Sequence, residues 1–344
     1  MGPEPERTWD GLEIASDDPR GCTVVVRREV APGTPQFLLL HRAHHGPDFA
    51  GDWAWTAPAG SRQPGEAVYP AALRELGEES GLTGLAVWAV DVGWRAEHGY
   101  GWAMLAVDVE PDTTIDLVDP EHDRYLWAPA EQAIELVRPS WVARRQFDAL
   151  ASAPFARLAF RPMRATDFAD VADWQQSSPV REWWDGRSLD EESVRARYLP
   201  RLRGANPTRM WVVEIDGLPS GFLQSYRVGD NDDYATKTGD PEAVGFDYAI
   251  GRPELIGRGL GTRMIWEFCR DVLRAEYPEA PRFLASPSHR NKRSLRALHK
   301  CGFTEGLWID NDMEPGETPD TEIVCTLDVA HWFGPVLSAS APRR

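Results

Sequence analysis

The feature that most constrains the fold of this chain is an acid-rich stretch, Arg74–Leu82, which reads RELGEESGL. It ends a segment that we predict to be a helix over Pro70–Ser80, because proline is tolerated in the first helical turn and Gly81 is a typical terminator. Residues three and four apart lie on the same face of a helix. Three carboxylates therefore share one face within a turn: Glu75, Glu78 and Glu79.

These carboxylates have two interpretations. Like charges at this spacing repel, so the face is costly unless a cation binds to it, and carboxylate oxygens suit Mg²⁺ or Mn²⁺ better than zinc. Arg74 lies four residues before Glu78 and eight residues after Glu66, so it can orient these side chains. A solvated acidic face is the alternative that an E-x-x-E-E pattern alone favours.

The chain before the helix extends the pattern. From Gly60 onward it matches G-x5-E-x7-R-E-U-x-E-E-x-G-U at every specified position, where U is a bulky aliphatic residue. This string resembles the box of Nudix hydrolases, and the resemblance covers about residues 20–150. It implies an α/β/α sandwich and hydrolysis of a nucleoside diphosphate linked to another group. Strand-like runs at 23–28, 37–41 and 103–109 agree with such a fold.

The resemblance also implies roles for single residues. A bound Mg²⁺ or Mn²⁺ would neutralise the pyrophosphate and help to generate a hydroxide, so its ligands would serve catalysis. Glu66 and Arg74 would form a supporting salt bridge. The metal ligands would be the backbone carbonyl of Gly60 and the carboxylates of Glu75, Glu78 and Glu79.

A later segment, Glu121–Trp127, reads EHDRYLW and resembles part of Nudix members that act on nucleoside triphosphates or dihydroneopterin triphosphate. Glu121 could complete the metal site or act as a base, and an exposed loop carboxylate is the alternative. His41, His44 and His45 flank the region without a further ligand at metal spacing. We therefore expect them to be exposed loop histidines.

The second half of the chain contains a glycine-rich loop, Ile256–Thr262, between a predicted strand over Val244–Ile250 and a predicted helix over Thr262–Glu276. Glycines allow the backbone to approach a phosphate closely, and a helix N-terminus offers unpaired N–H groups. A simple turn is the alternative for such a loop. The dinucleotide fingerprint G-x-G-x-x-G is not satisfied, because Thr262 stands at its third glycine, so a Rossmann domain is not predicted.

The order of features around the loop is more specific. A strand over Phe283–Ala285 follows the helix, and Asn291 then begins another helix that leads to Phe303. This order resembles the GNAT N-acetyltransferases over about residues 157–330. Five short matches resemble the aminoglycoside 6'-N-acetyltransferases within that superfamily: Glu182–Trp184, Tyr198–Pro200, Gly221–Tyr226, Gly245–Asp247 and Ser286–Ser288.

This second resemblance implies a coenzyme site and an acceptor site. Asp247 would bind the acceptor amine and help it to lose its proton, which a carboxylate can do directly or through water. Acidic residues at 230, 232 and 233 could add negative surface, and a solvated acidic loop is the alternative. Acetyl-CoA would be held by Ile256, Gly257, Arg258, Gly259, Gly261, Thr262 and Asn291. The acceptor would meet Glu182, Trp183, Trp184, Gln224, Tyr226 and Asp247.

Two positions depart from the pattern of that superfamily. Ile256 stands where many such loops begin with Gln or Arg, which removes one side-chain contact. Leu298 stands five residues before Phe303, where members with a general-acid tyrosine carry it. The proton for the departing thiolate must then come from elsewhere, and we expect solvent rather than the adjacent His299 to supply it.

Charge and hydropathy limit the partners. The net charge of −17 disfavours binding of duplex nucleic acid, and cationic small molecules or anions held through metal fit better. No apolar run approaches the roughly 18 residues of a membrane helix. The first residues lack the order of a signal peptide, so we expect a cytoplasmic protein. The cysteines lack close pairing, so we expect buried free thiols at Cys22, Cys269, Cys301 and Cys325.

The two halves differ in composition, since residues 1–150 contain no lysine. Between them, a run of small residues at 151–154 ends in proline, which is typical of a short linker. We predict a mixed α/β chain with a flexible tail over 1–19, a Nudix domain over 20–150, a linker over 151–156, a GNAT mixed-sheet domain over 157–334 and a second tail over 335–344.

These interpretations predict a bifunctional enzyme. One activity would be metal-dependent hydrolysis of a pyrophosphate bond of the nucleoside di- or triphosphate type. The other would be transfer of acetyl from acetyl-CoA to a primary amine, with the 6'-amine of an aminoglycoside as acceptor. The alternatives are another amine, such as a polyamine, a siderophore hydroxylysine or a peptide, and one silent domain that acts as a ligand sensor.

Overall fold

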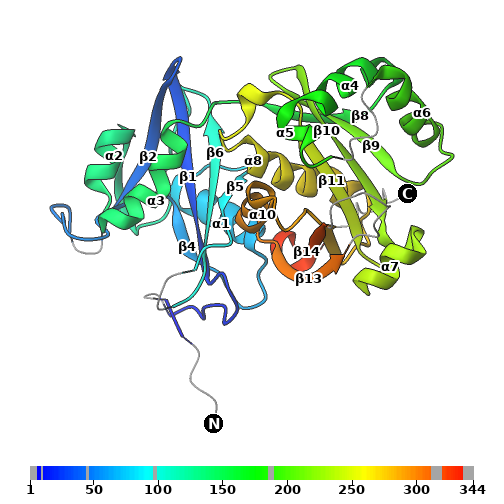
Figure 1. Ribbon diagram of the computed structural model, residues 1–344. Helices are drawn as coiled ribbons and strands as arrows, with labels where there is room; N and C mark the ends of the chain where they lie inside the picture. The colour runs from blue at the N-terminus through cyan, green and yellow to red at the C-terminus, as the bar shows by residue number, and fades with distance from the viewer. Residues whose placement is uncertain are drawn as a thin grey trace, which may run out of the picture. The chain divides into compact units, whose positions relative to one another are not determined.

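The computed structural model describes residues 6–8, 11–43, 46–95, 99–184, 190–310 and 320–335. The chain divides into two compact units, one of residues 1–155 with 331–334 and the other of residues 156–330 with 335–344 (Figure 1). Each unit has its own seven-stranded sheet within the described residues. No helix in these ranges is long and apolar enough to cross a membrane.

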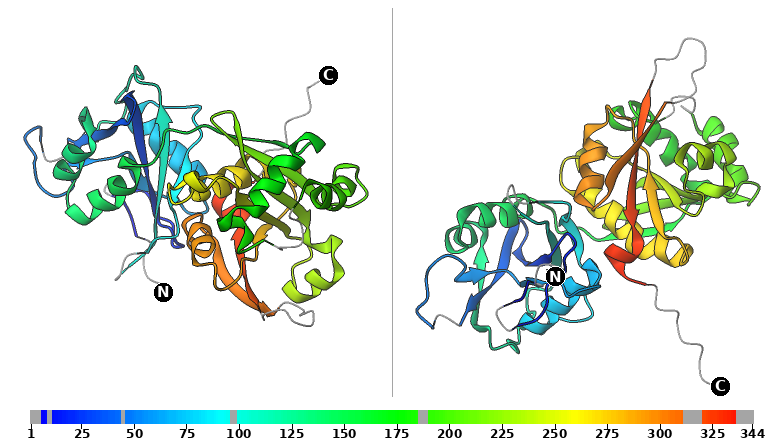
Figure 2. Two further views of the ribbon diagram at one scale, coloured as in Figure 1. Left: turned by 45° about the horizontal axis from the view of Figure 1, so that its top comes forward. Right: turned by 90° about the horizontal axis from the view of Figure 1, so that it is seen from below.

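The first unit is built around a mixed sheet. Its strands are β1 (Gly21–Ala31), β2 (Thr34–Arg42), β3 (Trp55–Thr56), β4 (Ala59–Ser61), β5 (Trp88–Asp91), β6 (Trp102–Val109) and β7 (His122–Pro129). Its helices are α1 (Val68–Ser80), α2 (Ala130–Leu136) and α3 (Ser140–Ala151). The sheet order is β3-β2-β1-β6-β5, with β4 on β1 and β7 on β2, and β1 runs parallel to β6. Figure 2 shows this sheet between α1 on one side and α2 with α3 on the other.

Helix α1 forms as the sequence predicts, although it begins at Val68 rather than Pro70. Its apolar face is buried through Val68, Ala71, Ala72 and Leu76, and burial of a leucine contributes about 2 kcal/mol. Gly81 ends the helix in the left-handed conformation with φ 71°, which costs other residues more than glycine. Of the three carboxylates on this helix, Glu75 and Glu79 are also buried, and Glu78 is exposed.

Two segments outside the predicted domain are held by arginines of the first unit. Residues 11–19, expected in a flexible tail, pack instead: Ala15 is buried, and the guanidinium of Arg62 donates to the carbonyls of Asp17 and Pro19 at 3.3 and 2.6 Å. Residues 151–154, expected as a linker, are fixed by Arg27. Its guanidinium donates to the carbonyls of Leu150, Ala153 and Pro154 at 2.8 to 3.0 Å.

The second unit is also a mixed sheet covered by helices. Its strands are β8 (Leu158–Pro162), β9 (Arg209–Ile215), β10 (Leu218–Arg227), β11 (Val244–Ile250), β12 (Arg282–Ala285), β13 (Thr304–Asp310) and β14 (Thr321–Asp328). Its α-helices are α4 (Phe168–Gln176), α5 (Ser178–Arg181), α6 (Glu191–Leu202), α7 (Asp232–Thr238), α8 (Leu260–Glu267), α9 (Arg274–Glu276) and α10 (Lys292–Lys300). Helix α11 (Val329–Phe333) begins in this unit and ends within residues 331–334 of the first unit. Short 3₁₀ turns lie at η1 (Ala165–Asp167), η2 (Val228–Asp230) and η3 (Pro253–Leu255).

The register of this sheet decides which side chains meet. The order is β13-β14-β12-β11-β10-β9-β8, and β10 pairs antiparallel with β11 so that Gln224 lies opposite Asp247. Because side chains alternate along a strand, both point to one face, the face that also carries Phe222. Residues of α4 and α6 pack on that face around Phe222. The other face carries Phe246, whose ring contacts Phe268.

A π-helical turn interrupts the long helix that follows the glycine-rich loop. The sequence predicts one helix over Thr262–Glu276, and the structure forms α8, a π-helical stretch η4 (Phe268–Leu273) and α9 in direct succession. The predicted N-cap of α10 is confirmed, since the Asn291 side chain accepts a hydrogen bond from the Ser294 backbone N–H at 3.0 Å. The prediction of buried free thiols is confirmed for all four cysteines.

Candidate functional sites

A large pocket opens in the first unit beside the acidic end of α1. Its volume is about 1150 Å³. Six of the predicted residues line it: Gly60, Arg74, Glu75, Glu78, Glu79 and Glu121. Five aromatic side chains line it as well: Trp53, Trp94, Tyr100, Trp102 and Trp141. The pocket therefore combines carboxylates with large ring surfaces.

The three helix carboxylates lie in different surroundings. Glu75 and Glu79 are 8% and 3% exposed, whereas the Glu78 side chain is half exposed. Burial, more than any nearby charge, raises the pKa of Glu75 to about 7 and raises that of Glu79 well above its usual range. One oxygen of Glu79 accepts a hydrogen bond from the Ala59 N–H at 2.9 Å.

Arg74 is the cation that holds this acidic face together. Its guanidinium donates to both carboxylate oxygens of Glu66 at 2.9 Å, to Glu75 at 2.7 Å and to Glu78 at 3.0 Å. Although burial raises it, the pKa of Glu66 is lowered overall by the bonds from Arg74. The structure thus brings together the two residues of the expected salt bridge, and it adds Glu75 and Glu78 to the same cation.

Gly60 lies directly against the carboxylate of Glu75. A Cβ atom at Gly60 would overlap all three carboxylate atoms of that side chain. Only glycine therefore lets the backbone of β4 approach the helix this closely. The approach places the Gly60 backbone beside a buried carboxylate, as a shared metal site requires.

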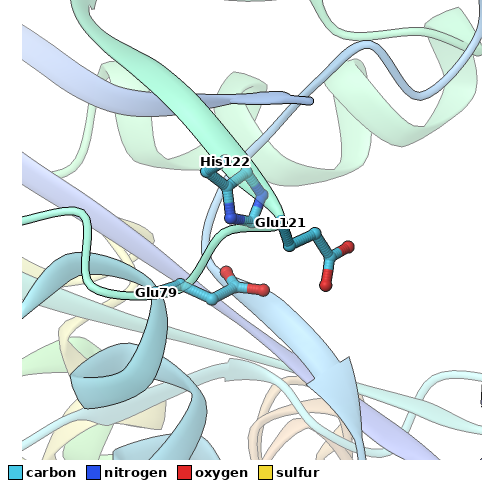
Figure 3. A group of neighbouring side chains, drawn as sticks. All are labelled: Glu79, Glu121 and His122. Atoms are coloured by element: carbon cyan, nitrogen blue, oxygen red, sulfur yellow. The ribbon is translucent and has the colours of Figure 1, made fainter. Parts of the chain in front are cut away.

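A second group of candidate ligands lies between α1 and the start of β7, and two of its members, Glu79 and Glu121, line the pocket. Single ligand atoms of Glu79, Glu121 and His122 all lie within 4.8 Å of one another. Figure 3 shows the three side chains turned toward one another from α1 and from the start of β7. Burial lowers the pKa of His122 to about 4, so its imidazole is neutral at neutral pH. His122 is a residue for which sequence reasoning gave no role.

These donors fit a divalent cation. Two buried carboxylates carry raised pKa values because the charged forms lose hydration, and a cation of higher charge than Arg74 would restore the charged forms. Oxygen donors of this number suit Mg²⁺ or Mn²⁺. The residues present would hold the ion through Glu75, Glu78, Glu79, Glu121 and the carbonyl of Gly60.

In the second unit, Asp247 lies at the centre of a polar group on the sheet. Gln224 donates from its amide nitrogen to Asp247 Oδ2 at 2.6 Å, and its amide oxygen accepts a hydrogen bond from Arg201 of α6. Burial raises the pKa of Asp247. Sequence reasoning did not identify Arg201, which reaches the site from a helix that the pattern left unassigned.

The other residues expected at the acceptor site differ in how closely they pack against this face of the sheet. Tyr226 is buried over Gly245, where any Cβ would meet its ring, and its ring contacts Tyr234. Trp184 packs its ring against Phe222 at 4.6 Å, while Trp183 and Glu182 are exposed. The acidic residues at 230, 232 and 233 are exposed.

The glycine-rich loop forms a bare helix N-terminus. Gly257 and Gly259 have φ values of 79° and 82°, which glycine adopts at little cost. Gly259 is the N-cap of α8 and has no side chain to accept the first N–H groups of the helix. Of the other residues expected at the coenzyme, Ile256 and Arg258 lie in the loop before Gly259, and Gly261 and Thr262 lie in the first turn of α8. Asn291 lies apart from the loop, at the N-cap of α10.

Next to this loop, β11 and β12 separate. Their parallel pairing joins Val244 to Phe283 and Gly245 to Leu284, and in the described residues it extends no further although β11 continues to Ile250. Backbone groups of β11 beyond Gly245 therefore lack a strand partner on the β12 side. An extended amide-containing chain could pair with such an edge, and the phosphates attached to it could reach the N-terminus of α8.

Comparison with known proteins identifies a domain in each half of the chain. A family model for the NUDIX domain matches residues 19–150, and a model for the acetyltransferase (GNAT) domain matches residues 164–311. The first half of the chain belongs to the Nudix family, and the second half contains a GNAT domain. The chain is an enzyme with a Nudix hydrolase domain and a GNAT acetyltransferase domain.

Individual relatives match each domain. Bis(5'-nucleosyl)-tetraphosphatase (asymmetrical) of Sus scrofa is 30% identical over 135 residues, which is 35% of this chain and 84% of the relative. Aminoglycoside N(6')-acetyltransferase type 1 of Klebsiella pneumoniae is 28% identical over 149 residues, which is 42% of this chain and 73% of the relative. A solved aminoglycoside acetyltransferase in complex with coenzyme A is 25% identical, covers 50% of this chain and 95% of its own, and has a TM-score of 0.44.

One expectation about the Nudix domain is wrong. His41 is fully buried in β2 rather than exposed in a loop. Its Nδ1 lies 2.7 Å from Asp123 and its Nε2 lies 2.8 Å from the carbonyl oxygen of Phe49, so both ring nitrogens are engaged. The alternation of β2 places this ring inward, and the two partners make its burial tolerable. His44 and His45 lie outside the described residues.

The GNAT domain has a buried Leu298 where related enzymes can carry a tyrosine. The structure also shows two hydroxyl groups in contact near this position. The side-chain oxygen of Tyr248 on β11 lies 2.5 Å from the Oγ of Ser294, which lies one turn before Leu298 on α10. His299 is exposed. Sequence reasoning did not identify this pair, which depends on a contact between β11 and α10.

Close packing at Gly60 gives a direct test of the Nudix site. We expect Gly60→Ala to lower hydrolysis about 100-fold, because a displacement of about 1 Å at a catalytic group has that effect. The matched control is Gly77→Ala on α1, where a Cβ would meet Thr83 at an ordinary 3.5 Å. That change should preserve activity and add about 0.5 to 1 kcal/mol of stability. Equal hydrolysis by the two variants would contradict the role given to Gly60.

Proposed function

We propose that the Nudix domain hydrolyses a pyrophosphate linkage in a nucleoside polyphosphate and that it needs Mg²⁺ or Mn²⁺ to do so. The observation that carries the proposal is the set of buried carboxylates on α1, which faces a pocket large enough for a nucleotide. The similarity to a bis(5'-nucleosyl)-tetraphosphatase favours a substrate with a polyphosphate chain.

The residues of the chain have distinct tasks in this proposal. A divalent cation bound there neutralises phosphate charge and lowers the pKa of a water molecule. Glu75, Glu78 and Glu79 hold the cation with the Gly60 carbonyl. Arg74 keeps Glu75 and Glu78 oriented, and the Ala59 N–H orients Glu79. Glu121 completes the ligand set, because a ligand atom of its side chain lies within 4.8 Å of one of Glu79.

The aromatic wall of the pocket supports a nucleotide rather than inorganic pyrophosphate as substrate. Trp141 is half exposed, and its ring stacks with Trp94 at 5.9 Å. The guanidinium of Arg145 lies 3.9 Å from the centre of the Trp94 ring and donates to the carbonyls of Asp91 and Trp102. A rigid, exposed ring of this kind can stack on a nucleobase.

Product analysis tests this function. Purified full-length protein would be incubated with diadenosine tetraphosphate, ATP or inorganic pyrophosphate, each with Mg²⁺, with Mn²⁺ or with a chelator, and the products separated by chromatography. We expect metal-dependent hydrolysis of a nucleoside polyphosphate and little hydrolysis of pyrophosphate. Equal turnover with and without chelator would contradict the metal requirement.

We propose that the GNAT domain transfers an acetyl group from acetyl-CoA to a primary amine, the 6'-amine of an aminoglycoside. The observation that carries this proposal is Asp247, a half-buried carboxylate on β11 beside the point where β11 and β12 separate. The similarity to an aminoglycoside N(6')-acetyltransferase supports this acceptor class. The net charge of −17 and exposed Glu182 suit a polycationic acceptor.

The chemistry requires a neutral amine. Asp247 binds the ammonium form and takes its proton, directly or through water, so that the nitrogen lone pair can form the bond to the acetyl carbon while the carbon–sulfur bond breaks. Gln224 holds the carboxylate in place by its hydrogen bond of 2.6 Å. Acetyl-CoA supplies the activated acyl group, and Gly257, Gly259 and Gly261 with Thr262 and Asn291 form its proposed binding loop.

Release of free thiol measures this second activity. Full-length protein with acetyl-CoA would be assayed against kanamycin-type compounds with a 6'-amine, analogues with a 6'-hydroxyl, polyamines and peptides. We expect thiol release with the 6'-amino compounds and none with the 6'-hydroxyl analogues. Modification of a polyamine or peptide in place of both would keep the acetyltransferase and exclude the aminoglycoside.

The coenzyme loop can be tested separately from the acceptor. We expect Gly259→Val to raise the dissociation constant of acetyl-CoA at least about 10-fold, because a branched side chain would stand in the approach to the α8 N-terminus. Gly217→Val is the matched control: it has φ 76° and, like Gly259, open space around the missing Cβ, but it lies in the β9–β10 turn. The two variants should be destabilised alike. Equal acetyl-CoA affinity by calorimetry would place the coenzyme elsewhere.

A further inference from the structure

His122 is a buried histidine that the proposed hydrolysis does not use. His122 is 4% exposed, and neither of its ring nitrogens has a hydrogen-bond partner among the described residues. A buried polar atom left without a partner costs about 1 to 3 kcal/mol, so such groups in native proteins generally contact water or an ion. The imidazole of His122 has two such buried nitrogen atoms without a partner.

The other buried histidine of this sheet shows that the fold can satisfy such a ring. His41 lies on the neighbouring strand, with Nδ1 at 2.7 Å from Asp123 and Nε2 at 2.8 Å from the Phe49 carbonyl. Both of its nitrogens are therefore engaged within the protein. The unsatisfied nitrogens of His122 are a local property of its position at the start of β7, beside Glu121.

The surroundings of His122 identify the kind of partner. Its ring faces the carboxylates of Glu79 and Glu121, with ligand atoms of all three inside 4.8 Å (Figure 3). Because Glu79 also accepts from Ala59 N–H, its position is fixed by the backbone. A neutral imidazole nitrogen beside two carboxylates is a donor set for a first-row divalent ion, since imidazole binds such ions better than it binds Mg²⁺.

We propose that His122 is a direct ligand of a first-row divalent metal ion, held together with Glu79 and Glu121, so that the Nudix domain prefers Mn²⁺ to Mg²⁺. This inference rests on the proposed hydrolase function, because the two share Glu79. It goes beyond that function by adding a nitrogen ligand to an oxygen site. The expected consequence is tighter binding of Mn²⁺ than of Mg²⁺. A site made only of oxygen ligands, such as those of Glu75 and Glu78, would not produce this preference.

Electron spin-echo spectroscopy of the full-length protein loaded with Mn²⁺ tests the nitrogen ligand without any assay of activity. We expect modulation from a directly coordinated ¹⁴N nucleus. Growth with ¹⁵N-labelled histidine should convert this signal to that of ¹⁵N, which assigns it to histidine in the unmodified protein. His122→Phe should abolish it, and His299→Gln, an exposed histidine of the GNAT domain, should leave it unchanged.

Metal titrations complete the test. His122→Phe should raise the Mn²⁺ dissociation constant at least about 10-fold and change the Mg²⁺ constant much less. Bound Mn²⁺ and normal nucleotide hydrolysis without nitrogen modulation in the unmodified protein would overturn the assignment of His122 alone. Failure of the protein both to bind Mn²⁺ and to hydrolyse any nucleotide would instead overturn the proposed hydrolase function. If His122→Phe does not fold, absence of the histidine ¹⁵N signal in the labelled unmodified protein would still overturn the proposal.

Discussion

Glu79→Gln should abolish nucleotide hydrolysis while it leaves acetyl transfer intact and raises the melting temperature of the metal-free Nudix domain. Glu79 is 3% exposed, and burial together with the negative charges of Glu75 and Glu121 raises its pKa. Glutamine keeps the shape and can still accept from the Ala59 N–H, but it has no charge to desolvate. The Glu79 carboxylate is therefore needed to bind the metal, and its buried charge destabilises the folded domain when no metal is bound.

The loss of hydrolysis should exceed about 100-fold, which is the upper range for residues that merely support a metal ligand. A second signature is thermal: Mn²⁺ should stabilise the unmodified protein and have little effect on Glu79→Gln, because an ion stabilises only the folded state that binds it. Glu135→Gln, an exposed position on α2, is the matched control and should change neither quantity. Full hydrolysis by Glu79→Gln would contradict its assignment as a ligand.

The sequence was sufficient for most elements whose pattern is local. Helix α1 was predictable because Pro70, the apolar spacing and Gly81 all act within a few residues. The long helix after the glycine-rich loop was predicted, but its π-helical stretch was not, since that depends on packing of Phe268 against strands distant in sequence. Residues 11–19 were expected to be flexible, because nothing local shows that Arg62 holds them.

The residues of the two sites show the same difference between local patterns, which the sequence predicts, and distant contacts, which it does not. The motif placed Glu66 and Arg74 near the three carboxylates, and in the structure the Arg74 guanidinium joins Glu66, Glu75 and Glu78. The roles suggested for His122 and Arg201 depend on contacts between elements far apart in the chain. His122 meets Glu79 only because β7 pairs with β2 at the edge of the pocket, and Arg201 meets Gln224 only because α6 packs on that face of the sheet. A pattern in one sequence contains no signal for such contacts.

The acceptor site depends on a single carboxylate held in an unusual place. A charged group inside a sheet is costly unless it is paired, and Asp247 has a neutral partner in Gln224 while the cationic Arg201 bonds that partner rather than the carboxylate. Burial accordingly raises the pKa of Asp247. An ammonium group of the acceptor would supply the missing positive charge, which gives the site both affinity for an amine and a base beside it.

Asp247→Asn should therefore lower acetyl transfer to 6'-amino aminoglycosides by about 10² to 10⁴-fold, the range that a positioned general base contributes, with acetyl-CoA affinity unchanged. Asparagine keeps an oxygen that can accept from Gln224, so the variant should fold. In the unmodified protein the rate should fall on the acid side at a pH above that of an ordinary carboxyl group, because the base must be ionised, and this limb should vanish in the variant. Asp170→Asn, an exposed acid on α4, removes the same charge and should preserve the rate. A full rate for Asp247→Asn would show that the amine loses its proton to another group.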